Sequence, residues 1–324
     1  MIAGVLIAAL VIVVLRLRQP AQPTSVATET VRIGYLPIYV DLPLFVAKER
    51  GFFSQRGVNV ELVRFSSSPE IGTALLSGGI NLGASIALPV ALSTEIRDPG
   101  RLKIFIVDSE NKDNYISSFV TMPNSGIKTL MDLKGKTIGS FPGPNAVTFC
   151  KLLLKQAGLD PQTDVKLVEL DVSTHISALS SGTVDALFTY EPTATQAVME
   201  KGAINFMPGA VERNIISPWM GGVWVVSADF AKNHPVETKA AIAALYDAIR
   251  YIRTNSAEAK GALTPYTSIK KEVAVATPDI PFSMLSELDV EAFQRNADIY
   301  NQQGLASKNI DVRSLLAPSS WVSP

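Results

Sequence analysis

The sequence contains a single cysteine, Cys150, among its 324 residues. One cysteine excludes an intramolecular disulfide and any metal site built from several cysteines. There are two histidines, His175 and His234, which lie far apart and have no partner cysteine, so we expect no metal site and no nucleophilic triad. Neither charge is in excess, because 29 basic and 30 acidic residues give a net charge of −1. The sequence therefore lacks the basic stripe that nucleic-acid binding requires.

The composition is that of a globular protein, with 47% hydrophobic and 18% charged residues. At roughly 100–200 residues per domain, the length suits two lobes better than one core. A long apolar run occurs only at the start, from Ile2 to Leu15, and a polar stretch containing proline follows it. This run is shorter than the roughly 20 residues needed to span a bilayer. We interpret residues 1–18 as an export signal or membrane anchor, leaving cleavage open, and residues 19–30 as a linker.

Beyond the linker, strand-like and helix-like segments alternate, which predicts an α/β architecture. The first expected elements are a strand at 31–36, a helix at 42–50 and a strand at 58–65. Asp41 is predicted to cap the first helix, and Ser67 with Glu70 to form a capping box for the next. Near the other end, Ile242, Leu245, Ile249 and Ile252 form one apolar stripe of a long helix that opens at Pro235. The segment 282–303 is expected to be helical throughout.

A short segment of the chain occurs twice. Residues 74–81 (ALLSGGIN) align without gaps with residues 178–185 (ALSSGTVD). Each copy predicts a helix that ends at a glycine, a tight turn, and an apolar strand that begins with a short polar side chain. Two α/β units of like construction indicate two similar lobes. We expect lobe 1 to comprise residues 31–115 and 220–324, and lobe 2 residues 116–219.

Several motifs, in order, resemble a known protein family. They are the run 34–53 (GYLPIYVDLPLFVAKERGFF) with Gly57–Val60, the segment 132–139 (DLKGKTIG), and the segment 185–192 (DALFTYEP). Together they resemble the substrate-binding proteins for nitrate, sulfonates, taurine and thiamine precursors (the NMT1/THI5-like family), over roughly residues 31–255. The resemblance implies the two-lobed type II periplasmic-binding-protein fold, in which each lobe is a mixed sheet flanked by helices and closes on the other around a hinge.

The same resemblance implies a function outside the cytoplasm. The chain would capture a small molecule and deliver it to an ABC permease in the membrane, as a monomer that is exported or anchored by its N-terminal segment. The ATPase would be a separate chain, since no phosphate-binding loop of the form Gly-x-x-x-x-Gly-Lys-Ser/Thr occurs in the sequence. No cofactor is expected.

Candidate ligand-binding residues cluster at the starts of predicted helices, where unpaired N–H groups and the helix dipole favour anions. These residues are Pro37, Asp41, Ser66, Ser67, Pro142, Gly143, Asn145 and Ala146, and Tyr35 is expected to add an aromatic wall. A second set follows from the repeat and from the expected return into lobe 1. Ser85 and Thr189 occupy equivalent strand ends, both expected to face the cleft, and Tyr190, Glu191 and Trp219 complete the set.

Two classes of ligand are considered, of which a sulfonate-, nitrate- or taurine-like anion is favoured. Serine- and glycine-lined helix ends favour a small anion such as a sulfonate, nitrate or taurine. Aromatic residues and Glu191 favour a ring compound resembling a thiamine precursor. An enzyme on the same fold, similar to thiamine-pyrimidine synthase, is the third alternative, but it would need an iron motif rich in cysteine and a reactive Lys–His pair. Cys150 instead lies on the apolar face of a predicted helix, so we expect no catalysis.

Overall fold

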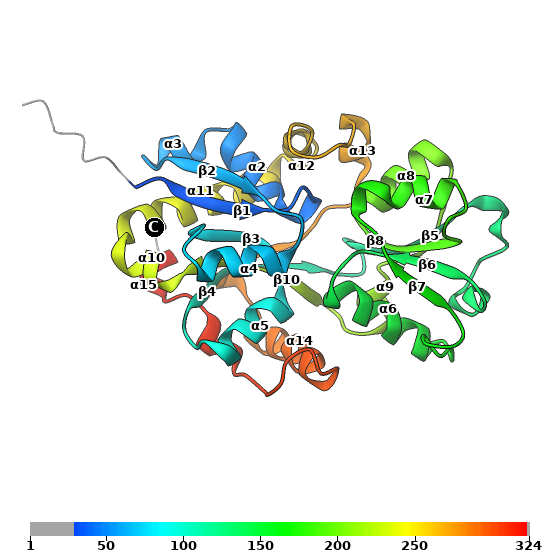
Figure 1. Cartoon of the computed structure of the whole chain (residues 1–324). Helices are drawn as coiled ribbons and strands as arrows, with labels where there is room; N and C mark the ends of the chain where they lie inside the picture. The colour runs from blue at the N-terminus through cyan, green and yellow to red at the C-terminus, as the bar shows by residue number, and fades with distance from the viewer. Residues whose placement is uncertain (1–28, 323–324) are drawn as a thin grey trace, which may run out of the picture.

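The computed structural model describes residues 29–322 and shows two lobes lying side by side (Figure 1). We call the part built on the six-stranded sheet lobe 1 and the part built on the five-stranded sheet lobe 2. The expected anchor at 1–18 lies outside the described residues, as does the linker at 19–30 apart from its last two positions. Within residues 29–322, no helix has the length and apolar character needed to cross a bilayer.

The sheet of lobe 1 has the strand order β11-β4-β10-β3-β1-β2. Its strands are β1 (Val31–Tyr35), β2 (Val60–Arg64), β3 (Leu82–Ala87), β4 (Leu102–Glu110), β10 (Trp219–Ser227) and β11 (Phe282–Met284). β1 runs parallel to β2 and β3, while β10 runs antiparallel to both β3 and β4. The strand β11 corrects the expectation of a continuous helix over 282–303. Phe282 and Met284 are buried along the edge of β4, a period of two that suits a strand.

Helices cover both faces of this sheet (Figure 1). On one face α2 (Leu42–Glu49) packs against α11 (Pro235–Thr254), whose expected apolar stripe is buried. On the other face lie α4 (Ser68–Leu76), α5 (Leu88–Arg97) and α14 (Val290–Gln302). The shorter helices of lobe 1 are α3 (Phe52–Gln55), α10 (Ala228–Asn233), α12 (Ser256–Ala259), α13 (Lys271–Ala276) and α15 (Ser319–Val322).

The sheet of lobe 2 has the order β7-β6-β8-β5-β9. Its strands are β5 (Ser117–Thr121), β6 (Thr137–Ser140), β7 (Lys166–Glu169), β8 (Ala186–Tyr190) and β9 (Ile204–Pro208). The helices α6 (Pro144–Gln156), α7 (His175–Ser180), α8 (Thr193–Lys201) and α9 (Ala210–Asn214) pack around it. Cys150 is fully buried in α6, as the apolar spacing predicts.

The internal repeat corresponds to matched sheets. The order β2-β1-β3-β10-β4 of lobe 1 repeats in lobe 2 as β7-β6-β8-β5-β9, with the same parallel and antiparallel pairings. The short polar residue that begins each equivalent strand also has the same role. The Arg32 N–H donates to Asn81 Oδ1 (2.7 Å), and the Thr137 N–H donates to Asp185 Oδ2 (2.8 Å). Each side chain thus ties the start of its strand to the strand beside it.

Two expected helix caps are wrong. Asp41 precedes α2, but its Oδ2 accepts the Leu36 N–H (2.7 Å) because the turn 39–41 directs the carboxylate back toward β1. Ser67 precedes α4, but its hydroxyl donates to Glu70 Oε1 (3.0 Å) and caps no helical N–H group. Glu70 Oε2 accepts the Ser66 N–H (3.2 Å), so the acid braces the turn ahead of the helix.

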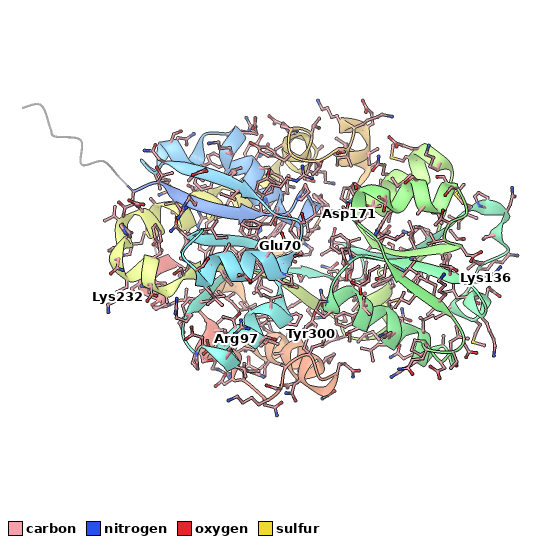
Figure 2. All side chains as sticks on the ribbon, viewed as in Figure 1. Glu70, Arg97, Lys136, Asp171, Lys232 and Tyr300 are labelled. Carbon is pink, nitrogen blue, oxygen red and sulfur yellow. The ribbon has the colours of Figure 1, made fainter. Side chains whose placement is uncertain are left out.

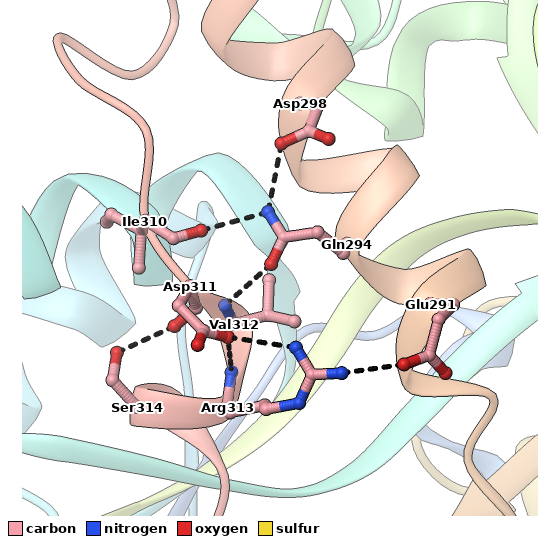
Figure 3. A network of polar contacts seen from close by, with 8 residues as sticks. All are labelled: Glu291, Gln294, Asp298, Ile310, Asp311, Val312, Arg313 and Ser314. Atoms are coloured by element: carbon pink, nitrogen blue, oxygen red, sulfur yellow. Dashed lines mark hydrogen bonds and ion pairs between the residues drawn. The ribbon is translucent and has the colours of Figure 1, made fainter.

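The C-terminal segment is fastened to α14 and to the edge of lobe 1 (Figure 3). The side chain of Gln294 donates to the carbonyl of Ile310 (2.9 Å) and accepts the Val312 N–H (2.9 Å). Arg313 pairs with Glu291 on the same helix (2.6 Å). Beyond this network, the Ala317 N–H donates to Ile104 of β4 (2.8 Å), so the segment covers backbone that would otherwise be an open sheet edge.

Candidate functional site

A cavity lies between the lobes at the ends of the central strands. Its empty volume is about 820 Å3, including its opening to solvent. Lobe 1 contributes residues near the ends of β3 and β4 and at the starts of β10 and α4. Lobe 2 contributes the end of β8 and the start of α6. This position, outside the ends of the central strands, is where α/β proteins commonly bind small molecules.

The lobe 1 wall centres on Asp108, Ser85 and Gly222. The Ser85 hydroxyl donates to Asp108 Oδ2 (2.7 Å), and both side chains are at least nine-tenths buried. Gly222 lies on β10 between the two strands that carry them, paired with Asp108 on one side and Ala87 on the other. A Cβ at Gly222 would lie 2.4 Å from both Asp108 oxygens, so only glycine lets the carboxylate take this position. Ser85 itself has φ of 27°, a conformation that non-glycine residues rarely adopt.

The lobe 2 wall carries a second carboxyl group, that of Glu191 directly after β8. The side chain is 3% exposed, and its Oε2 accepts the Thr195 N–H (3.0 Å) at the start of α8. Beside it runs the loop 141–146, in which Gly143 has φ of 102° and donates its N–H to Glu169 Oε2 (2.8 Å). That N–H group is therefore engaged within lobe 2, whereas the N–H groups of Asn145 and Ala146 have no helical acceptor because they open α6.

Aromatic rings form a continuous apolar wall. The ring centroids of Phe141 and Tyr190 are 5.4 Å apart, and those of Tyr190 and Trp219 are 5.9 Å apart. All three residues line the cavity, together with Ile38 and Ile116. Such a wall can bury the body of an organic ligand and can stack against a ring.

The electrostatics of the cavity are those of buried acids. Burial raises the pKa of Asp108 to about 7, against the lowering effect of the Ser85 hydroxyl. Burial likewise raises the pKa of Glu191 to about 7, while the bond from Thr195 and the more distant charge of Lys260 oppose the shift. Behind the wall, the pKa of Asp41 is raised by burial and by the neighbouring charge of Asp108. Among the described residues that line the cavity, none is lysine or arginine.

The structure brings together most of the residues predicted from the sequence. Those that line the cavity are Ser67, Ser85, Pro142, Gly143, Asn145, Ala146, Tyr190, Glu191 and Trp219. Whether they contact a ligand stays a prediction, because no ligand is present.

Five predicted residues lie elsewhere. Tyr35 packs edge-on against Phe45 in the core of lobe 1 (5.4 Å between ring centroids). Asp41 is fully buried behind the lining residue Val40. The remaining three are Pro37, the exposed Ser66, and Thr189.

Thr189 departs from its expected place because lobe 2 contains a partner that lobe 1 lacks. Its Oγ1 is 2.9 Å from Nδ1 of His175, and Thr189 is fully buried. The equivalent Ser85 is bonded to Asp108 and lines the cavity. The repeat thus predicts the strand position correctly, and the different neighbours decide which hydroxyl lines the cavity.

Asp108 is the main residue that sequence reasoning missed. A signal existed, because Asp108 follows the apolar run Ile104–Val107 and is an acid within a buried strand. Sequence reasoning also missed Ala87, Val90 and Ser68, which line the cavity at the starts of α5 and α4. These small or apolar residues carry no distinctive chemistry that a sequence alone could reveal.

The joint between the lobes is fixed by a third buried acid. Glu110, at the end of β4, accepts the Ile116 and Ser117 N–H groups through Oε2 (2.7 and 2.8 Å). Its Oε1 accepts the Ser117 hydroxyl (2.8 Å) and the Glu212 N–H (2.9 Å). One carboxylate therefore connects the last strand before the crossing with β5 and with α9.

A second connection between the lobes runs through Tyr300. Figure 2 shows this residue on α14, on the side of lobe 1 that faces lobe 2. Its hydroxyl accepts the indole N–H of Trp219 (3.3 Å) and donates to Asn145 Oδ1 of α6 (2.8 Å). Phe149 of α6 meets both rings edge-on, at centroid distances of 5.1 and 5.4 Å. The start of α6, which borders the cavity, is thus bonded to lobe 1.

Comparison with known proteins identifies relatives of this chain. A model of the NMT1-like family matches residues 25–264. The bicarbonate-binding protein CmpA of Synechococcus elongatus is 23% identical over 296 residues, covering 79% of this chain and 63% of that protein. The nitrate/nitrite binding protein NrtA of a Nostoc species is 24% identical over 281 residues, covering 80% of this chain and 62% of that protein. This chain therefore matches less than two thirds of the length of either relative.

Solved structures share the whole architecture. The alkanesulfonate-binding protein SsuA of Xanthomonas axonopodis pv. citri, bound to MOPS, superposes with a TM-score of 0.72 at 22% identity, covering 90% of this chain and 99% of that chain. The desulfurization enzyme DSZB superposes with a TM-score of 0.66 at 20% identity, covering 90% and 97%. The expected two-lobed type II periplasmic-binding-protein fold is confirmed. Because binding proteins and an enzyme share this fold, the fold alone does not decide between them.

Proposed function

The chain belongs to the NMT1-like family, and we propose on this basis that it is the extracytoplasmic solute-binding component of an ABC importer. It captures a small molecule in the cavity between the lobes and delivers it to a membrane permease with a separate cytoplasmic ATPase. The family membership and the cavity walled by both lobes together support this function. The observation that carries it is that Ser85 and Asp108 on lobe 1 and Tyr190 and Glu191 on lobe 2 line one shared cavity.

Capture works through closure of the lobes. A molecule in the cavity contacts residues of both lobes only when the lobes are close, so its binding favours the closed state by the free energy of those extra contacts. The permease then receives the closed, loaded form. We propose that the working protein is a monomer and that residues 1–18 direct its export or hold it at the membrane.

We favour a small acidic ligand of the sulfonate, nitrate or taurine kind. Two relatives that are similar in sequence are named for bicarbonate and for nitrate or nitrite. In this chain, the starts of α4 and α6 both border the cavity, and helix starts favour negatively charged groups. A ring compound such as a thiamine precursor is the alternative, for which the wall of Phe141, Tyr190 and Trp219 is the relevant observation.

An enzymatic function is not favoured by the residues of this cavity. Cys150 is fully buried in α6 away from the cavity, and burial raises the pKa of its thiol, which disfavours the reactive thiolate. His175 does not line the cavity. Within residues 29–322, no group of three or more His, Cys, Asp or Glu side chains could hold a metal ion.

A thermal-shift screen of the full chain tests the proposed function. The added solutes are nitrate, bicarbonate, taurine, ethanesulfonate and 4-aminopyrimidine. A true ligand at 100 times its Kd raises the free energy of unfolding by about 2.7 kcal/mol, which appears as a higher Tm. Ala87→Trp, at a lining position with ordinary extended backbone (φ −60°, ψ 133°), should fill the cavity and remove the shift. A shift that persists in this variant, or no shift with any solute, would contradict the proposal.

A further inference from the structure

Two buried carboxyl groups line the cavity and a third lies near it, and among the residues that the structure describes no lysine or arginine lines it. Asp108 and Glu191 face the cavity at 2% and 3% exposure, and Asp41 lies directly behind it at 0%. The Asp41 Oδ1 is buried without a hydrogen-bond partner in the described part of the chain. The charge of Lys260 acts on Glu191 from outside the cavity lining. The Lys260 Nζ is already bonded to Asp279 (2.8 Å) and to the carbonyl of Thr277 (2.6 Å).

Such an arrangement is costly for an empty cavity. A buried carboxylate is stable only when opposite charges or several hydrogen-bond donors compensate it. The protein supplies few donors, since Asp108 is hydrogen-bonded by the Ser85 hydroxyl and by its own backbone N–H. Glu191 is held by Thr195 alone. By contrast, Glu110 at the joint receives four donors and is a structural acid. The carboxylates of Asp108 and Glu191 therefore have capacity to accept further hydrogen bonds, and a ligand can supply the donors.

We propose that the cavity selects solutes that carry a protonated nitrogen, which binds to the carboxylates of Asp108 from lobe 1 and Glu191 from lobe 2. This inference rests on the proposed function and specifies its ligand. A protonated amine supplies the missing charge and up to three N–H donors, and hydrogen bonds between charged groups are roughly twice as strong as neutral ones. Because one carboxylate belongs to each lobe, a shared cation also connects the lobes and favours closure.

The remainder of the cavity fits such a solute. The faces of Phe141, Tyr190 and Trp219 attract cations as well as apolar groups. The starts of α4 and α6 can take an acidic group at the other end of the same molecule, so an aminosulfonate or an amino acid satisfies both parts of the cavity. Among the small acidic solutes favoured above, taurine carries such a nitrogen, whereas nitrate would meet the buried acids Asp108 and Glu191 without a compensating cation among the described lining residues.

One competing chemistry shares these residues. If both acids were protonated, they could donate hydrogen bonds to an oxyanion, and the cavity would then select anions. The two chemistries differ in what Asp→Asn and Glu→Gln changes do. An amide keeps an N–H donor for an anion but removes the charge that a cation needs.

The experiment compares matched pairs of solutes by isothermal titration calorimetry on the full chain at pH 8. Each pair differs in its amine: taurine with ethanesulfonate, β-alanine with propionate, and benzylamine with benzyl alcohol. We expect at least one amine to bind roughly ten- to a hundredfold more tightly than its partner. Asp108→Asn and Glu191→Gln should each remove most of that preference. Glu61→Gln, which changes the net charge equally at an exposed position on β2, should leave it intact.

The outcomes distinguish selection of a protonated nitrogen from the capture of solutes in general. Equal or tighter binding of the partner without the amine, or a preference that survives in Asp108→Asn and Glu191→Gln, overturns the inference and leaves solute capture standing. Failure of all six solutes to bind overturns the inference, and the thermal-shift screen then decides whether solute capture stands. The comparison of pairs in the unmodified protein needs no variant, so it holds even where a substitution disturbs folding.

Discussion

At the scale of single residues, the buried acids couple protonation to stability. The pKa values of Asp108 and Glu191 are raised to about 7, above the value near 4 of an unfolded chain. An acid with a higher pKa in the folded state binds its proton more readily when folded. Protonation therefore stabilises the fold fully below pH 4, and this contribution is lost as the pH rises toward 7.

We expect the free energy of unfolding of the empty protein to fall between pH 5 and pH 7. Each such acid contributes a slope of about 1.4 kcal/mol per pH unit. Asp41 and Glu110, whose pKa values burial also raises, add to the same slope. Chemical denaturation at stepped pH measures it. Asp108→Asn should make the profile shallower, and Glu61→Gln should not; an unchanged profile in Asp108→Asn would mean that this acid does not titrate in the range.

At the scale of elements, the joint between β4 and β5 depends on one side chain. Glu110 accepts four hydrogen bonds from Ile116, Ser117 and Glu212, and these atoms are buried. Removing the carboxylate leaves buried donors without partners, each of which costs about 1–3 kcal/mol.

Glu110→Ala should therefore lower the free energy of unfolding by roughly 3–5 kcal/mol. Glu110→Gln, which keeps one acceptor oxygen, should lower it less. Urea denaturation measures both. Glu258→Ala removes an exposed acid paired with Arg50 and is the control, with an expected change below about 1 kcal/mol. Equal stability of Glu110→Ala and the unmodified protein would show that the joint does not rely on this acid.

Elements were predicted from the sequence where local patterns are strong. The alternation of strands and helices, the stripe of α11 and the repeat of 74–81 in 178–185 correspond to structure. The errors arose where tertiary partners override local chemistry. Asp41 and Ser67 stand at helix starts but bond elsewhere, and β11 follows the edge of β4 in a segment expected to be helical. No local pattern shows which distant edge is available.

The residues of the cavity, like the helices and strands, were predicted in part. Motif residues at helix starts and strand ends, such as Gly143 and Glu191, do line one cavity. Asp108 was missed because it lies in a segment that matches no motif, and its role depends on Ser85, 23 residues earlier, and on the missing side chain of Gly222. Thr189 was misplaced because His175 holds its hydroxyl.

At the scale of the whole molecule, contacts between the lobes set the balance of open and closed states. The Tyr300 hydroxyl connects Trp219 of lobe 1 to Asn145 of lobe 2, and Lys270 pairs with Glu200 of α8 (3.0 Å). Tyr300 is 1% exposed, whereas the side chain of Lys270 is 72% exposed, so the first contact should matter more.

Tyr300→Phe should favour the open state and weaken binding of a ligand about fivefold to tenfold, since the lost hydrogen bond is worth about 1 kcal/mol. Titration calorimetry measures the affinity, and small-angle X-ray scattering measures the mean radius of the empty protein, which should increase. Lys270→Ala is the matched control and should change both little. An affinity unchanged in Tyr300→Phe would show that this bond does not favour closure.

Within residues 29–322 the chain crosses between the lobes after β4 and again before β10, and these two strands are neighbours because Trp219 of β10 pairs with Glu110 of β4. We expect two adjacent crossings of this kind to act as a hinge, so that one lobe rotates against the other mainly about one axis. The distance between one fluorophore on each lobe would follow that rotation.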